Sequence, residues 1–171
     1  MGKNILIITG TQKFPFDRLL EAADSLAAPG GVLFSDTVEA QSGTGTYVPK
    51  HYKCVPFFSP EEMEEKINWA DLVITHGGTG SIISAVIKGK KVIAVPRLSV
   101  YGEHVDDHQK ELISAFAEAG YILKALNTDE LEKEIKASGR FHPAKWSGGG
   151  DGLIRAVEAE IRKAPCRQKH R

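Results

Sequence analysis

The chain has 171 residues, of which 42% are hydrophobic and 26% are charged, a composition typical of ordinary globular proteins. This length suits one domain and is too short for two full doubly wound domains, which need about 300 residues. The 22 basic and 22 acidic side chains balance, so the protein has no overall field that would steer it to nucleic acid.

Short apolar runs alternate with amphipathic segments along the chain. The first half predicts a strand, a helix, two strands and a helix, in that order, at Asn4–Thr9, Phe16–Ala28, Gly31–Asp36, Lys53–Phe58 and Ser59–Ala70. The second half predicts three strands, each followed by a helix, and a last helix: Asp71–Thr75 and Gly80–Lys88, Lys91–Val95 and Val105–Ala119, Tyr121–Ala125 and Asp129–Ser138, then Gly152–Lys163. This alternation predicts an α/β protein with a Rossmann-like, doubly wound parallel sheet.

We expect residues 1–163 to form a single domain and residues 164–171 to form a basic tail. The tail is either a solvated terminus or a segment attracted to an anionic membrane or a partner. The two cysteines, Cys54 and Cys166, form no CxxC pair, which argues against a disulfide framework and a zinc knuckle and suits a reducing cytosol. No run approaches the roughly 18 apolar residues of a membrane span, so we expect a soluble chain.

The most distinctive motif is the segment Thr75–Ser81 (THGGTGS), between a predicted strand and a predicted helix. Its three glycines would let the backbone approach a ligand closely, and the helix start offers free N–H groups to a phosphate. Ser81 would add a hydroxyl, and His76 would donate to an anionic oxygen. The alternative is a tight turn whose glycines serve packing only. A Walker A loop is excluded because Gly89-Lys90 is followed by Lys91, and no GxGxxG follows the first strand.

Ligands of open parallel sheets bind beyond the carboxyl ends of the strands. The site is therefore expected in three loops, Gly10–Pro15, His76–Ser81 and Arg97–Gln109. The third loop carries hydrogen-bonding side chains suited to sugar hydroxyls, although a solvated helix start would also favour its acidic residues. A metal site is disfavoured, because no spacing there matches a known ligand set.

These segments resemble the family 28 glycosyltransferase C-terminal domain over about residues 4–125. They are most similar to the small soluble subunits of two-component enzymes of capsule and exopolysaccharide synthesis, and to the soluble subunit of dolichyl-diphosphate N-acetylglucosamine synthase. The residues that carry the match are Gly10-Thr11, Pro15–Leu19, Thr75–Ile82, Gly89–Ile93, Pro96-Arg97 and Glu103–Gln109.

The resemblance implies the donor-binding half of a GT-B fold, with a UDP-sugar as substrate and neither metal nor cofactor. It implies catalytic roles for His76 and Glu103. The donor diphosphate would be bound by Gly10, Thr11, Gly77, Gly78, Thr79, Gly80 and Ser81, and the sugar by Asp106, Asp107, His108 and Gln109. Several relatives have an acidic residue that binds the ribose on the helix after the glycine loop, where this chain has Ser84.

A complete GT-B enzyme has two such domains with the active site between them. The resemblance therefore implies a membrane-anchored partner that supplies the acceptor domain and presents a polyprenyl-diphosphate-linked saccharide. The expected reaction is an inverting transfer of a hexose, by a protein held at the cytoplasmic face of the membrane through that partner. The alternatives are a non-catalytic regulatory subunit that binds a nucleotide sugar, and an epimerase, which is disfavoured because it would need a dinucleotide fingerprint.

Overall fold

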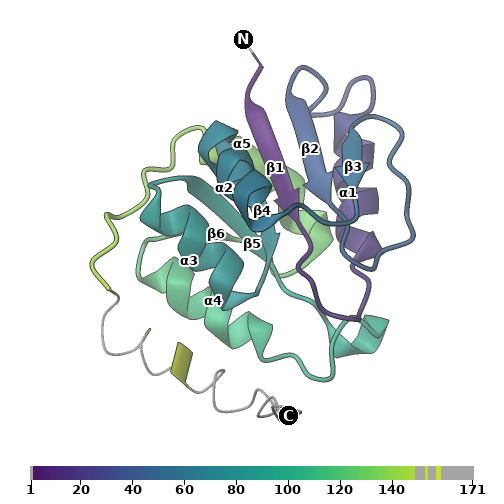
Figure 1. The fold of residues 1–171 in the computed structure, drawn as a ribbon. Coiled ribbons are helices and arrows are strands. Elements are labelled where there is room, and N and C mark those ends of the chain that lie inside the picture. Colours follow the sequence, from purple (N-terminus) through teal and green to yellow (C-terminus); the bar gives the residue numbers. More distant parts are fainter. Residues whose placement is uncertain (1, 149–152, 154–156, 159–171) are drawn as a thin grey trace.

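The structure is a computed structural model that describes residues 2–148, 153, 157 and 158 (Figure 1). Six strands form one parallel sheet in the order β3-β2-β1-β4-β5-β6. The strands are β1 (Asn4–Ile8), β2 (Thr37–Gln41), β3 (Lys53–Val55), β4 (Leu72–His76), β5 (Lys91–Val95) and β6 (Leu123–Lys124). The order reverses between β1 and β4, which is where open α/β sheets bind their ligands.

Helices cover both faces of the sheet, as a doubly wound fold requires (Figure 1). They are α1 (Asp17–Ala27), α2 (Pro60–Trp69), α3 (Thr79–Ile87), α4 (Gln109–Glu118) and α5 (Leu131–Ser138), with short 3-10 turns at η1 (Ser99–Tyr101) and η2 (Thr128–Glu130). Among the described residues, no helix is long and apolar enough to cross a membrane.

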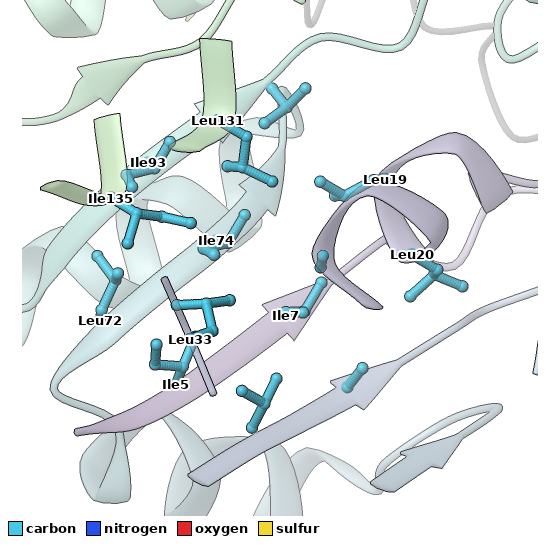
Figure 2. Packing of buried hydrophobic residues seen from close by; sticks show 14 of the residues in the cluster. Ile5, Ile7, Leu19, Leu20, Leu33, Leu72, Ile74, Ile93, Leu131 and Ile135 are labelled. Atoms are coloured by element: carbon cyan, nitrogen blue, oxygen red, sulfur yellow. The ribbon is translucent and has the colours of Figure 1, made fainter. Parts of the chain in front are cut away.

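Alternate residues of the central strands point to opposite faces of the sheet, where they contribute to two separate hydrophobic cores. Ile5 and Ile7 of β1 pack on one face with residues of α1 and α5, such as Leu19 and Leu131 (Figure 2). Leu6 and Ile8 point to the other face, where the buried side chains of α2, α3 and α4 include Ile67, Ile82, Val86, Leu112, Ile113 and Phe116. The predicted α/β class and doubly wound parallel sheet are confirmed.

One predicted strand is wrong. Residues 31–36 form turns, with backbone hydrogen bonds from Leu33 to Leu26 and from Asp36 to Leu33, and the strand follows at Thr37–Gln41. The apolar residues of this run predict a strand, and Leu33 is indeed buried, but it reaches the core from a turn. Gly31 allows that path, since a Cβ there would collide with the carbonyl of Leu26.

The helix predicted from Val105 begins later, at Gln109. The side chain of Asp106 accepts a hydrogen bond from the backbone N–H of His108 (3.1 Å) and that of Asp107 accepts one from Ser99 (2.8 Å), which stabilises a bent segment before the helix. The helix predicted at 152–163 and the tail at 164–171 lie outside the described residues, apart from positions 153, 157 and 158.

Candidate functional site

A pocket of about 390 Å³ opens at the edge of the sheet formed by the carboxyl ends of the strands, where the strand order reverses between β1 and β4. Its lining residues come from β1 and the loop after it, from the end of β2, from α2 and the two residues before it, and from the end of β4 into α3: Ile8, Gly10, Thr11, Gln12, Gln41, Phe58, Ser59, Pro60, Met63, Ile67, His76, Gly78, Gly80, Ser81 and Ser84. None of these carries an acidic or a lysine or arginine side chain. Across the described part of the chain, no group of three or more His, Cys, Asp or Glu side chains is placed to hold a metal ion.

Two helices begin at this pocket, and their first turns differ. In α2, Ser59 accepts a hydrogen bond from the N–H of Glu62 (3.1 Å), and the Glu62 carboxylate accepts one from the N–H of Ser59 (2.7 Å). In α3, the residue before the helix is Gly78, no side chain caps the N–H groups, and the first turn has no acidic residue. The α3 start therefore keeps its free N–H groups and positive dipole end for a ligand, which favours an anion.

His76, the last residue of β4, lies between two glycines. A Cβ at Gly10 would lie 2.7 Å from Nε2 of the His76 ring, and a Cβ at Gly78 would collide with the same atom. Gly10 also has a φ of +87°, which other residues rarely adopt. Both positions must therefore be glycine for the His76 ring to reach the pocket wall.

The His76 side chain is neutral at pH 7. Burial, followed by the positive charge of Arg97, lowers its pKa to about 3. Its Nδ1 lies 3.4 Å from the carbonyl oxygen of Ile8, which can only accept a hydrogen bond. This contact favours a proton on Nδ1, which would leave Nε2 to accept a hydrogen bond from a ligand rather than to donate one to an anionic oxygen as expected.

The structure separates the second predicted cluster from the pocket wall. Asp107 accepts hydrogen bonds from the N–H and hydroxyl of Ser99 (2.8 and 2.9 Å). Asp106 lies between His104 and His108, with oxygen–Nδ1 distances of 3.2 and 2.8 Å. Burial opposes ionisation of Asp106, but hydrogen bonds from His108 outweigh it and lower the pKa of the carboxyl group. The cluster is thus held within its own loop, beside the pocket.

Gln109 has a different place from the one expected for a sugar ligand. Its side chain is 4% exposed, and its Oε1 accepts hydrogen bonds from the N–H groups of Gly77 (3.1 Å) and Arg97 (2.9 Å). A Cβ at Gly77 would lie 2.7 Å from the Cβ of Gln109. Gln109 therefore joins the glycine loop to the loop after β5, and the Gly77 N–H expected to contact a phosphate is already used.

Glu103, predicted to be catalytic, forms a buried ion pair. Its two carboxylate oxygens accept hydrogen bonds from Nε and Nη2 of Arg18 (2.8 and 2.9 Å), and Oε2 also accepts one from the N–H of Leu98 (2.9 Å). The Arg18 guanidinium lies 4.6 Å from the centre of the Tyr101 ring. This geometry ties the η1 loop to α1 and occupies both carboxylate oxygens of Glu103, whose catalytic role stays a prediction.

We expect Glu103→Gln and Arg18→Met each to lower the free energy of unfolding by about 2–4 kcal/mol, because each leaves a partly buried charge without its partner. The double variant should lose less than the sum of the two, which urea titrations of all four proteins would measure. Glu132→Gln, which breaks an exposed pair with Lys136, is the control and should change stability by less than about 0.5 kcal/mol. Additive losses would contradict the coupling.

Several pocket residues were missed in the sequence. Gln41 and Phe58 line the pocket, and Oε1 of Gln41 accepts a hydrogen bond from the N–H of Phe58 (2.9 Å). Gln41 was missed because the strand was expected at residues 31–36, and Ser59 was considered only as a helix cap. The position of each residue was the available signal: Gln41 ends β2 and Ser59 follows β3, so both lie at the edge of the sheet where ligands bind.

The fold and the pocket define an α/β domain whose ligand edge presents an uncapped helix start, as anion-binding Rossmann-like domains do. A sequence model of the glycosyltransferase family 28 C-terminal domain matches residues 4–144. The chain belongs to this family.

The relatives named UDP-N-acetylglucosamine transferase subunit ALG13 include the human and the mouse protein. The human protein is 29% identical over 128 residues, which are 70% of this chain, and the mouse protein is 32% identical over 87 residues, or 48% of it. The matched regions span only 11% and 7% of these two proteins' own lengths.

Solved structures share the fold at low sequence identity. The solution structure of ALG13 has a TM-score of 0.56 at 19% identity and covers 91% of this chain and 95% of its own. The calicheamicin glycosyltransferase CalG4 has a TM-score of 0.57 at 17% identity, with 96% of this chain covering 45% of it, so this domain corresponds to about half of a GT-B enzyme. A Listeria monocytogenes protein described as a UDP-N-acetylglucosamine 2-epimerase has a TM-score of 0.58 at 15% identity, covering 94% of this chain and 43% of that one. The fold by itself therefore does not separate sugar transfer from epimerisation.

Proposed function

We propose that this protein is the donor-binding, catalytic subunit of a two-component inverting glycosyltransferase, which moves a hexose from a UDP-sugar to a polyprenyl-diphosphate-linked saccharide in polysaccharide synthesis. Membership of glycosyltransferase family 28 supports the activity, and the name of the ALG13 relatives supports a UDP-sugar and a partner subunit. The observation that carries the proposal is the uncapped start of α3, which opens on the pocket.

In this proposal the donor diphosphate lies against the first turn of α3, within reach of the backbone of Thr79, Gly80 and Ser81. Gly10, Thr11 and Gly78 line the same part of the pocket and leave room for it. The acceptor hydroxyl attacks the anomeric carbon, the bond to the diphosphate breaks, and the configuration inverts. Backbone N–H groups fixed in advance stabilise the negative charge that develops on the leaving nucleoside diphosphate.

We assign His76 to the sugar rather than to charge stabilisation. A neutral ring with Nε2 as an acceptor would orient a donor hydroxyl group at the pocket wall. The sugar would extend from the pocket toward Asp106, Asp107 and His108, the polar cluster at the neighbouring loop.

The hydroxyl of Ser84 donates to the carbonyl of Gly80 (2.7 Å) and Ser84 lines the pocket. We propose that it is a weak neutral contact for the ribose, in place of the acidic residue of several relatives. The acceptor domain and the catalytic base come, in this proposal, from a membrane-anchored partner. That partner would hold the protein at the cytoplasmic face of the membrane.

The test is nucleotide binding by the purified chain. We expect calorimetry in the presence of EDTA to show binding of UDP and of UDP-N-acetylglucosamine, with UMP weaker by at least tenfold, or about 1.4 kcal/mol, because it lacks the second phosphate. UDP-glucose, UDP-galactose and UDP-glucuronic acid would then rank the donor sugar. No heat change with any nucleoside diphosphate at millimolar concentration would refute the proposed function.

A further inference from the structure

Arg97, which follows β5, is the largest fully buried side chain among the described residues, at 1% exposure. Its guanidinium donates hydrogen bonds to the carbonyl of Thr9 through Nη2 and to those of Phe14 and Pro15 through Nη1. These carbonyls stand at the two ends of the loop that follows β1. Arg97 therefore connects the start and the end of a loop whose middle residues line the pocket.

The charge of Arg97 has no carboxylate bonded to it. Its hydrogen-bond acceptors in the described residues are backbone carbonyls, including that of Glu103 at 3.4 Å, and its Nε has no partner there. The Glu103 carboxylate is instead bonded to Arg18. Burial lowers the pKa of Arg97 to about 10, and the nearby charge of Glu103 opposes that shift, so the guanidinium stays protonated at pH 7. Burying a cation without a bonded carboxylate costs folding free energy, so a charge kept at such a position suggests a function.

The position of Arg97 beside the pocket suggests that its charge acts on a bound ligand. The pocket lining has no acidic, lysine or arginine side chain. Arg97 lies close enough to His76, a pocket residue, for its charge to act on the imidazole ring, and His104 adds a smaller effect of the same sign. Since screening is weak in a protein interior, a fixed charge there favours an anion in the adjoining pocket.

We propose that Arg97 is a positioning residue of the donor site, which clamps the loop from Thr9 to Pro15 and supplies, from behind the pocket wall, the positive charge that the pocket lining lacks. The second half of this inference rests on the proposed function, because it needs an anionic ligand. The first half concerns the ligand-free protein and stands independently of it.

Two variants separate the clamp from the charge. Arg97→Lys keeps the charge but cannot reach carbonyls at both ends of the loop, whereas Arg97→Met removes both properties. In both variants, hydrogen exchange of the backbone amides of Gly10, Thr11 and Gln12 should be about tenfold faster than in the wild type. Arg140→Met removes an exposed charge away from the pocket and should leave exchange unchanged.

In the ligand-free protein, NMR titration of the His76 ring measures the electrostatic effect of the Arg97 charge. We expect His76 to stay neutral to the lowest pH at which the fold persists in the wild type and in Arg97→Lys, and to titrate at a higher pH in Arg97→Met. With ligand, Arg97→Met should bind UDP at least tenfold more weakly but bind uridine as the wild type does, and Arg97→Lys should retain most of the UDP affinity.

The outcomes are distinct. If Arg97→Met changes neither the His76 titration nor the UDP affinity, the electrostatic role is wrong. The same holds if this variant loses UDP and uridine binding equally, because an equal loss indicates a purely structural residue. Wild-type exchange rates in Arg97→Lys overturn the clamp, and this variant decides that point even where Arg97→Met does not fold. If the wild-type protein binds no UDP, the proposed function fails, while the exchange and titration experiments still decide the ligand-free role of Arg97.

Discussion

We expect Gly80→Val to abolish UDP binding while the protein stays folded. Gly80 lines the pocket in the first turn of α3, and a Cβ there meets no protein atom within 4 Å. The valine side chain would therefore extend into the pocket, where we propose that the diphosphate binds. The loss should be at least 100-fold, or about 2.7 kcal/mol, measured by calorimetry, with unchanged circular dichroism as evidence of the fold.

Gly139→Val is the matched control for this substitution. Gly139 also has helical backbone angles, at the end of α5, and a Cβ there makes only an ordinary contact, 3.5 Å from the carbonyl of Lys136. UDP affinity should be unchanged in this variant. Gly78→Ala should instead destabilise the fold, because its Cβ would collide with the His76 ring. Wild-type UDP affinity in Gly80→Val would mean that the nucleotide binds elsewhere.

The second large effect concerns catalysis by the chain alone. We expect the purified protein, supplied with UDP-sugars and a polyprenyl-diphosphate-linked sugar, to turn over at least 100-fold more slowly than in the presence of membranes that contain the proposed partner. Residues of one domain line the pocket, and this domain covers 45% of the calicheamicin glycosyltransferase CalG4. Positioning of an acceptor, which lowers a barrier by roughly 7–11 kcal/mol, is then missing.

The measurement is transfer of labelled sugar to lipid, with and without such membranes. Membranes plus the Gly80→Val variant are the control, and they should show no more transfer than membranes alone, since the donor site is blocked. Full turnover by the pure wild-type chain, unaffected by added membranes, would contradict the two-component proposal and require a self-contained active site.

Local signals in the sequence predicted much of the fold. The alternation of apolar runs and amphipathic segments predicted the parallel α/β sheet, and Ser59 with Glu62 forms the predicted capping box. The glycine segment after β4 lines the pocket at the start of α3, as its position between a strand and a helix indicated. These features depend on residues close together in the chain, where spacing and backbone preference decide the structure.

The tertiary structure decided which polar side chains are available to a ligand. Glu103 had the chemistry of a catalytic residue, but it pairs with Arg18, which is 85 positions away in the sequence. Gln109 looked like a sugar ligand, but its amide oxygen is bonded to Gly77 across 32 positions. Such long-range pairing leaves no mark in local spacing, because a carboxylate or an amide has the same sequence signature whether its acceptor atoms face a pocket or a buried N–H group.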